Sequence, residues 1–407
     1  MSRVFAKAIP AYLAVFLGMV LLASCSGRSQ GQGSDIPVAA KGDAVKIGIC
    51  MPSDGPWAHL SGYQSIGIRM AGELLKEKTG RNIELISRDP GTCPRETVVA
   101  VRDLLMEDKV SGIISCMSVE EAVAVQEMLS RNPVPFIATA PCSGGKLKEG
   151  QRGVRICTSL EDQAYACARF LSDELKTKRI GLVVAVDDPV IVRLASLFSS
   201  ELIKTHSRIV DVAYVKKGVD PAPSLVHLME EKPDAVYIPF FGASAFATVA
   251  KLRSIDENKP ILISPLQGEE DILGRADNTM MGVYIQTDFI EEAVVSPLGR
   301  EFLEYRRKHG KFKDPFSAAM AVGAEACFLT LDMISEARKS TMEGSLQAAA
   351  SWEGPLLGMK GVTPKGAVYK RLLFGKIEKR FLGSATVKHV ASVSMIRSDP
   401  VADVGTQ

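Results

Sequence analysis

The sequence predicts an α/β protein of two lobes, each built on a doubly wound parallel sheet. Short apolar runs alternate with longer segments of helical periodicity, which is typical of parallel sheets covered by helices. The alternation occurs twice, on either side of a break at residues 143–153. A chain of 407 residues is also too long for one hydrophobic core. Two such units would leave a cleft between them.

The first series begins with a buried strand at Val45–Cys50, an apolar run that ends in a loop of Pro, Ser, Asp and Gly. Helical periodicity then alternates with short apolar runs. We expect helices near 62–78, 95–107 and 119–131, and strands at 83–87, 110–116 and 134–138.

The second series follows the break and has the same pattern. Asp220 before Pro221 fits an N-cap followed by proline at the first helical position. We expect helices near 162–176, 190–204, 221–231 and 244–254, and strands at 180–186, 209–215, 235–239 and 261–263.

The N-terminus has the features of a bacterial secretory signal. Arg3 and Lys7 precede an apolar run over residues 9–23 that ends in small residues. Leu22-Ala23-Ser24-Cys25 resembles a lipobox, which implies a signal peptide over residues 1–24 and a lipid on Cys25. Residues 25–43 would then form a flexible tether. A plain cleaved signal with an accidental cysteine is the alternative. Either way we expect export, and with the lipid an anchor at the periplasmic face of the cell envelope.

The charge balance gives no reason to expect a nucleic-acid partner. The first 24 residues hold two basic residues and no acid, so the remainder has 47 basic against 47 acidic side chains. No second long apolar stretch stands out, so membrane attachment is expected through the N-terminal lipid only.

Enzyme signatures are missing from the sequence. No glycine-rich dinucleotide fingerprint follows the first strand, and no phosphate loop is present. The five histidines form no constellation, and neither cysteines nor histidines have metal-ligand spacing. We therefore expect no catalysis, no metal and no cofactor.

Several motifs occur in an order and spacing that resemble one family. They are Gly55-Pro56, a helix with Gly67 and Ala71, Val134-Pro135-Phe136-Ile137, Asp162-Gln163, and the segment from Lys365-Gly366 to Gly375-Lys376. From about residue 44 to 384 the chain is similar to type I periplasmic binding proteins, within them the branched-chain amino-acid receptors of ABC importers.

The resemblance implies lobes joined by a hinge that the chain crosses three times. Lobe 1 would comprise residues 44–158 and 288–355. Lobe 2 would comprise residues 159–287 and 356–385. Residues 386–407 would form a C-terminal tail. It also implies capture of a small molecule by hinge closure and delivery to an ABC permease and its ATPase. Sensing through a receptor or regulator is the alternative.

Ligands in open parallel sheets bind beyond the carboxyl ends of the strands. The loops there match the family's ligand-contacting loops. Ser118 begins a helix and suits a carboxylate, although with Glu121 it also fits an ordinary capping box. The candidate ligand residues are Trp57, Leu60, Tyr63, Met117, Ser118, Ala140, Cys142, Val190, Phe241 and Gln267.

Four of these positions depart from the amino-acid receptors. Leu60, Val190 and Phe241 stand where those receptors carry an aromatic residue or a tyrosine, and Gln267 stands near the glutamate that binds the ligand's ammonium group. A neutral residue cannot compensate a buried ammonium group, so the changes favour a less polar ligand such as an organic acid. Glu269 or Glu270 can take the missing role if the loop aligns differently.

Cysteine usage fits an oxidising compartment. The resemblance implies a disulfide between Cys93 and Cys116, with Cys25 lipidated. The pairing of the remaining five stays open, and because their number is odd at least one should be free: Cys50, Cys142, Cys157, Cys167 and Cys327.

Overall fold

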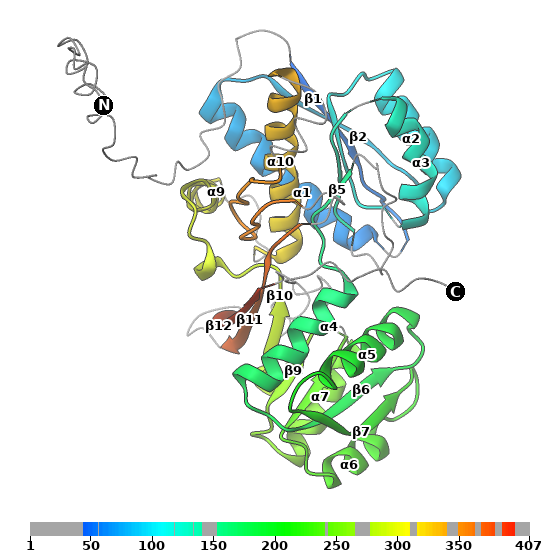
Figure 1. Ribbon diagram of the computed structural model, residues 1–407, viewed down its shortest axis with the longest axis vertical. Coiled ribbons are helices and arrows are strands. Elements are labelled where there is room, and N and C mark those ends of the chain that lie inside the picture. The colour runs from blue at the N-terminus through cyan, green and yellow to red at the C-terminus, as the bar shows by residue number, and fades with distance from the viewer. Residues whose placement is uncertain are drawn as a thin grey trace, which may run out of the picture. The chain divides into compact units, whose positions relative to one another are not determined.

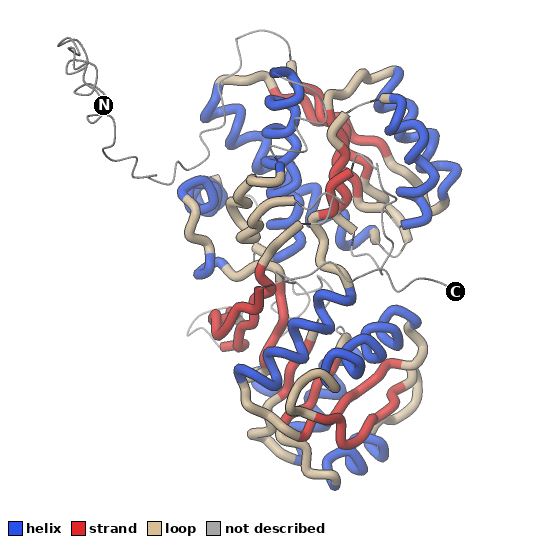
Figure 2. Tube along the Cα trace, in the orientation of Figure 1, coloured by secondary structure: helices blue, strands red, loops and turns tan. Residues whose placement is uncertain are grey.

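The computed structural model describes most of the chain beyond the N-terminal segment. The described residues are 44–55, 57–117, 119–132, 134–140, 153–240, 243–264, 277–309, 316–339, 349–362, 368–378 and 385–394. Figure 1 traces the element order, and Figure 2 shows helices lying along both faces of the sheets. The mixed α/β architecture with parallel sheets confirms the predicted fold class.

The first lobe contains a five-stranded parallel sheet in the order β2-β1-β3-β4-β5. Its strands are β1 (Val45–Cys50), β2 (Ile83–Arg88), β3 (Gly112–Ser115), β4 (Phe136–Ala138) and β5 (Gly153–Arg155). Helices α2 (Pro94–Met106) and α3 (Val119–Arg131) cover one face. The other face packs on α1 (Ala58–Thr79) and α10 (Ala318–Lys339), and α9 (Pro297–Lys308) joins the same core.

The second lobe contains a seven-stranded sheet in the order β12-β11-β10-β9-β8-β6-β7. The strands are β6 (Arg179–Ala185), β7 (Arg208–Val215), β8 (Ala235–Ile238), β9 (Ile261–Ile263), β10 (Tyr284–Thr287), β11 (Arg371–Glu378) and β12 (Thr386–Ser394). The pairs from β6 to β10 are parallel, whereas β11 and β12 are antiparallel to their neighbours.

Helices flank both faces of this sheet. One face packs on α4 (Leu160–Arg169), its π-helical continuation η1 (Phe170–Glu174) and α5 (Pro189–Leu202). The other packs on α6 (Ala222–Glu230) and α7 (Ala243–Ile255), next to the short 3₁₀ helix η2 (Asn278–Met280). A further 3₁₀ turn, η3 (Glu291–Ala293), follows β10.

Several helix starts are determined locally. Ser159 accepts a hydrogen bond from the Asp162 N–H at the start of α4, and Asp188 does the same for α5, ahead of Pro189. Such caps satisfy N–H groups that have no partner within the helix. The expected helix over 162–176 is instead two elements, because regular α-helix ends at Arg169 and π-helix continues to Glu174.

Two predicted lobe boundaries are wrong. Residues 386–394 are not tail but strand β12, which pairs with β11 over its whole length, with one register shift between Phe374 and Gly375. Residues 356–362 belong with the first lobe, since Leu356, Leu357, Met359 and Val362 are buried in its core. The third connection between the sheets therefore lies between Val362 and Arg371, after the first at 156–160 and the second at 287–297.

Helix α10 is a long apolar stretch that the sequence analysis overlooked. Over Ala318–Ala337 it is long and apolar enough to span a bilayer, and it is the one helix of this kind among the described residues. In the fold 94% of this apolar stretch is buried inside the protein. Because it packs against both α1 and the sheet, its apolar surface is covered by protein.

Two glycines allow α1 and α10 to pack backbone against backbone. A Cβ atom on Gly67 would overlap the Met320 carbonyl oxygen, and one on Gly323 would overlap the Gln64 carbonyl oxygen. Each helix thus places a glycine against the backbone of the other, so there is no room for a side chain at Gly67 or at Gly323.

Candidate functional site

The carboxyl ends of the first-lobe strands carry a small apolar cluster. Leu60 from α1, Cys116 after β3, Ala140 after β4 and Ala319 from α10 are buried together. Met51, Trp57 and Tyr63 pack against them and are partly exposed. This arrangement is expected for a ligand surface in a parallel sheet, because the loops after neighbouring strands converge at one edge.

The structure brings together four of the residues predicted to contact ligand: Trp57, Leu60, Tyr63 and Ala140. Met117 lies on the opposite face of the sheet, buried among α2 and α3. Val190, at the start of α5 in the second lobe, is 40% exposed. Ser118, Cys142, Phe241 and Gln267 lie outside the described residues, as does Cys25.

The loop after β1 is held by the loop after β2. Asp89 accepts hydrogen bonds from the Ser53 backbone N–H at 3.1 Å and from the Ser53 hydroxyl. It also accepts from the Gly91 N–H at 2.8 Å. The Ser53 hydroxyl is the main cause that lowers the pKa of Asp89, so the carboxylate remains charged and keeps the loop that leads to Trp57 in place.

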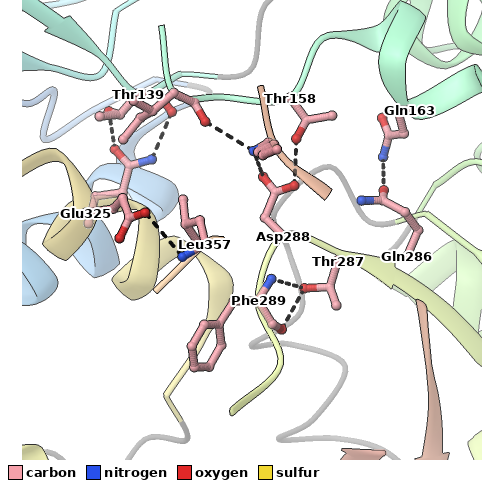
Figure 3. Close-up of polar contacts among 12 residues, drawn as sticks. Thr139, Thr158, Gln163, Gln286, Thr287, Asp288, Phe289, Glu325 and Leu357 are labelled. Atoms are coloured by element: carbon pink, nitrogen blue, oxygen red, sulfur yellow. Dashed lines mark hydrogen bonds and ion pairs between the residues drawn. The ribbon is translucent and has the colours of Figure 1, made fainter. Parts of the chain in front are cut away.

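A buried polar pair lies beneath the cluster. The Gln64 side-chain amide donates to the Thr139 carbonyl oxygen at 3.1 Å, and the Thr139 hydroxyl lies 2.5 Å from the Gln64 side-chain oxygen. Thr139 lies at the upper left of Figure 3. It ties α1 to the end of β4, so two of the segments that form the cluster are connected directly.

The predicted disulfide between Cys93 and Cys116 is wrong in this structure, where both are free thiols. Cys116 is fully buried on the α1 and α10 face of the sheet. Cys93 is the N-cap of α2, which covers the opposite face.

Four of the described thiols have a raised pKa and are therefore poorly suited to nucleophilic chemistry. Burial raises the pKa of Cys50, Cys116, Cys167 and Cys327 to about 12. A thiol with so high a pKa stays protonated at neutral pH and reacts slowly. Within the described ranges no three His, Cys, Asp or Glu side chains gather in a way that could hold a metal ion.

A second polar group lies in the other lobe, beside the first connection. The Gln163 amide on α4 donates to the Ser264 hydroxyl at 2.5 Å and to the Gln286 side-chain oxygen on β10 at 2.6 Å. Figure 3 shows Gln163 and Gln286 facing one another. Ser264 directly follows β9, so the group fixes the point at which the chain leaves this strand.

A buried ion pair joins the connections between the two sheets. Asp288 in the second connection accepts a hydrogen bond from the Thr158 hydroxyl at 2.6 Å and lies 3.0 Å from the Lys370 ammonium group. Lys370 also donates to the Ile156 carbonyl oxygen at 3.1 Å. We call Thr158, Asp288 and Lys370 the hinge cluster (Figure 3). Sequence reasoning missed it, because three polar residues far apart in the chain form no motif.

Glu325 on α10 is a fully buried carboxyl group. It lies 2.8 Å from the Leu356 N–H and 3.3 Å from the Leu357 N–H, and both amides donate to it. Burial raises its pKa to about 8, although the two amides and the charge of Lys370 lower it. Glu325 therefore holds the turn that precedes the third connection against the first lobe.

The comparisons agree with this architecture. The sequence model of the family described as periplasmic binding protein matches residues 44–367. No curated protein sequence matches the chain.

Many solved structures share the fold. A leucine-binding protein from Thermotoga maritima has a TM-score of 0.66 and 22% identity, over 86% of this chain and 98% of that chain. A branched-chain amino-acid binding protein from Streptococcus pneumoniae, in complex with isoleucine, has a TM-score of 0.67 and 19% identity, over 86% and 100% of the two chains. A solute-binding protein from Rhodopseudomonas palustris, in complex with 3,4-dihydroxybenzoic acid, has a TM-score of 0.68 and 18% identity, over 87% and 98%. At these identities the likeness establishes the fold.

Proposed function

Because this chain belongs to the periplasmic binding protein family, we propose that it captures a small molecule outside the cytoplasmic membrane and presents it to the permease and ATPase of an ABC importer. The observation that carries the proposal is the convergence of Trp57, Leu60, Tyr63 and Ala140 at the carboxyl ends of the first-lobe strands. The family is one of binding proteins, and we propose a role without catalysis.

The ligand that this surface favours has a substantial apolar part. Aliphatic and small side chains form the buried cluster, and two aromatic rings, Trp57 and Tyr63, lie against it. Burying an apolar group on such a surface is favourable, at about 25 cal/mol per Å². An aromatic or aliphatic acid, or a neutral apolar molecule, matches it. Relatives of this fold were solved with isoleucine and with 3,4-dihydroxybenzoic acid, so the architecture accommodates both kinds of ligand.

Leucine, isoleucine and valine are expected to bind weakly. Gln267 stands near the position where the resemblance implies a glutamate, and an uncompensated ammonium group costs about 1–3 kcal/mol, or one to two powers of ten in affinity. Isothermal titration of the mature chain with these amino acids, and in parallel with benzoate and 4-hydroxybenzoate, measures the difference.

The variant Gln267→Glu is the matched comparison. It should gain affinity for leucine and lose affinity for the aromatic acids, because a new carboxylate attracts an ammonium group and repels an anion. Sub-micromolar binding of leucine by the unaltered chain would contradict this ligand assignment and indicate Glu269 or Glu270 as the ammonium partner.

Cys25 is proposed as the site of lipid attachment, on the basis of Leu22-Ala23-Ser24-Cys25 and the tether that follows. The Cys25→Ala variant should leave the membrane fraction and appear in the soluble exported fraction. Metabolic labelling with a radioactive fatty acid checks the chemistry, and labelling should disappear in the variant. A variant that stays in the membrane fraction and keeps the label would disprove lipid attachment at Cys25.

A further inference from the structure

We infer that the hinge cluster couples the two lobes, because a single buried carboxylate, that of Asp288, connects all three chain segments that pass between them. The inference extends the proposed function, in which hinge closure accompanies capture of the ligand. Its test uses no ligand, so it can fail while the proposed function stands.

Each member of the cluster comes from a different connection. Thr158 lies in the first, between β5 and α4; Asp288 lies in the second, directly after β10; Lys370 lies in the third, directly before β11. The Lys370 ammonium group also reaches back to the Ile156 carbonyl oxygen of the first connection. Asp288 and Lys370 therefore link every pair of connections: first to second, second to third, and third to first.

The position of Asp288 is determined locally. The Phe289 N–H donates to the Thr287 hydroxyl at 3.1 Å, and this hydroxyl lies 3.1 Å from the Phe289 carbonyl oxygen. Thr287 therefore closes a tight turn around Asp288. In Figure 3 this turn lies beneath the Asp288 carboxylate, which points toward Thr158. The second connection is thus shaped to present its carboxylate to the other two.

Burial makes the cluster difficult to take apart. The side chains of Asp288 and Lys370 are each 3% exposed. An ion pair at this depth adds little net stability compared with an apolar pair, but removing one partner strands the other charge in a medium that solvates it poorly. The second and third segments therefore cannot separate without stranding a charge, and departure of the first segment removes one hydrogen bond from each charge.

The same geometry still permits rotation. The flexible Lys370 side chain can keep its contacts when the backbone direction changes, and so can the Thr158 hydroxyl. The backbone hydrogen bonds of a sheet tolerate such changes less well. Separation of the segments, in contrast, breaks the contacts of both side chains. We therefore expect the lobes to turn about the cluster while remaining coupled, so that the mature chain unfolds as one cooperative unit.

Calorimetry of the mature chain tests the coupling. The unaltered protein should unfold in a single transition. Lys370→Met, which leaves Asp288 without its counter-charge, should split it into two transitions, with the first lowered by roughly 10 °C. Thr158→Val removes one hydroxyl group at nearly constant volume. The rate of backbone hydrogen exchange should then rise together at 156–159, 287–290 and 369–371. This measurement tests the coupling even if Lys370→Met fails to fold.

Two controls match the chemistry without altering a side chain of the hinge cluster or one that contacts it in the structure. Lys360→Met removes an exposed lysine that lies 3.0 Å from Glu353 within the first lobe, and Thr330→Val removes a buried hydroxyl that bonds Ala326 within α10. Both should keep the single transition and the exchange pattern of the hinge. Two transitions in the unaltered protein, or exchange in Thr158→Val that rises only at 156–159, would overturn the inference.

Discussion

Replacing Gly67 with alanine should destabilise the protein by roughly 3 kcal/mol or more, one of the two largest effects expected of a single substitution in this chain. The new methyl group would overlap the Met320 carbonyl oxygen, and this atom belongs to the backbone of α10. Since neither helix can give way by a side-chain rotation, the two axes must separate, and contacts along the whole crossing weaken. Gly323→Ala should have a similar effect, because its methyl group would overlap the Gln64 carbonyl oxygen.

Gly62→Ala is the matched control, in the same helix as Gly67. No atom lies within 4 Å of a Cβ atom built on Gly62. Alanine at an exposed helical position is favoured over glycine, so this variant should be more stable by about 0.5–1 kcal/mol. Equilibrium unfolding in urea measures all three variants. If Gly67→Ala and Gly62→Ala proved equally stable, α1 and α10 would not meet at the backbone.

Raising the pH from 5 to 9 should lower the free energy of unfolding by an amount on the order of a few kcal/mol through Glu325 alone. Burial raises its pKa from 4.5 to about 8 in the folded chain. Between these values the unfolded chain has released the proton while the folded chain retains it. Stability is therefore greatest below the unfolded pKa and declines until the pH passes the folded one.

Glu325→Gln isolates this contribution, because glutamine does not titrate. At pH 5 the variant should be less stable by about 1–3 kcal/mol, since its amide group cannot accept from both the Leu356 and Leu357 N–H groups. Its stability should then fall less steeply with pH than that of the unaltered chain, and the two curves should approach one another near pH 9. Glu353→Gln, which removes an exposed carboxyl group of the same lobe, is the control for the substitution itself. Parallel profiles for Glu325→Gln would show that Glu325 titrates normally.

Elements with a strong local pattern were predicted closely. Strands Val45–Cys50 and Ile261–Ile263 and helix Val119–Arg131 have the predicted bounds. In each case an apolar run or a helical period is interrupted by turn residues, so a short stretch of chain contains the whole signal. Strand β12 was missed because its apolar residues are interrupted by polar ones and none is fully buried, and its pairing with β11 defines it.

The candidate site was predicted only in part. Trp57, Leu60, Tyr63 and Ala140 do gather, because the ends of parallel strands meet at one edge of the sheet. Ala319 joins them from α10, more than 170 residues away along the chain, and nothing near Ala140 signals it. Met117 faces α2 and α3 because consecutive residues at a strand end point to opposite faces, and Cys116 already points toward α1.

The sequence by itself determined the α/β class, the two series of alternating elements and the edges of the sheets where a ligand is expected. These follow from apolar periodicity, which local neighbours set. Only the tertiary structure decided that α1 and α10 meet at two glycines, that Cys93 and Cys116 are both free thiols, and that Thr158, Asp288 and Lys370 share one buried carboxylate. These features involve residues far apart in the chain. Their effect on the free energy of folding depends on burial, and a residue is buried only once the chain has folded.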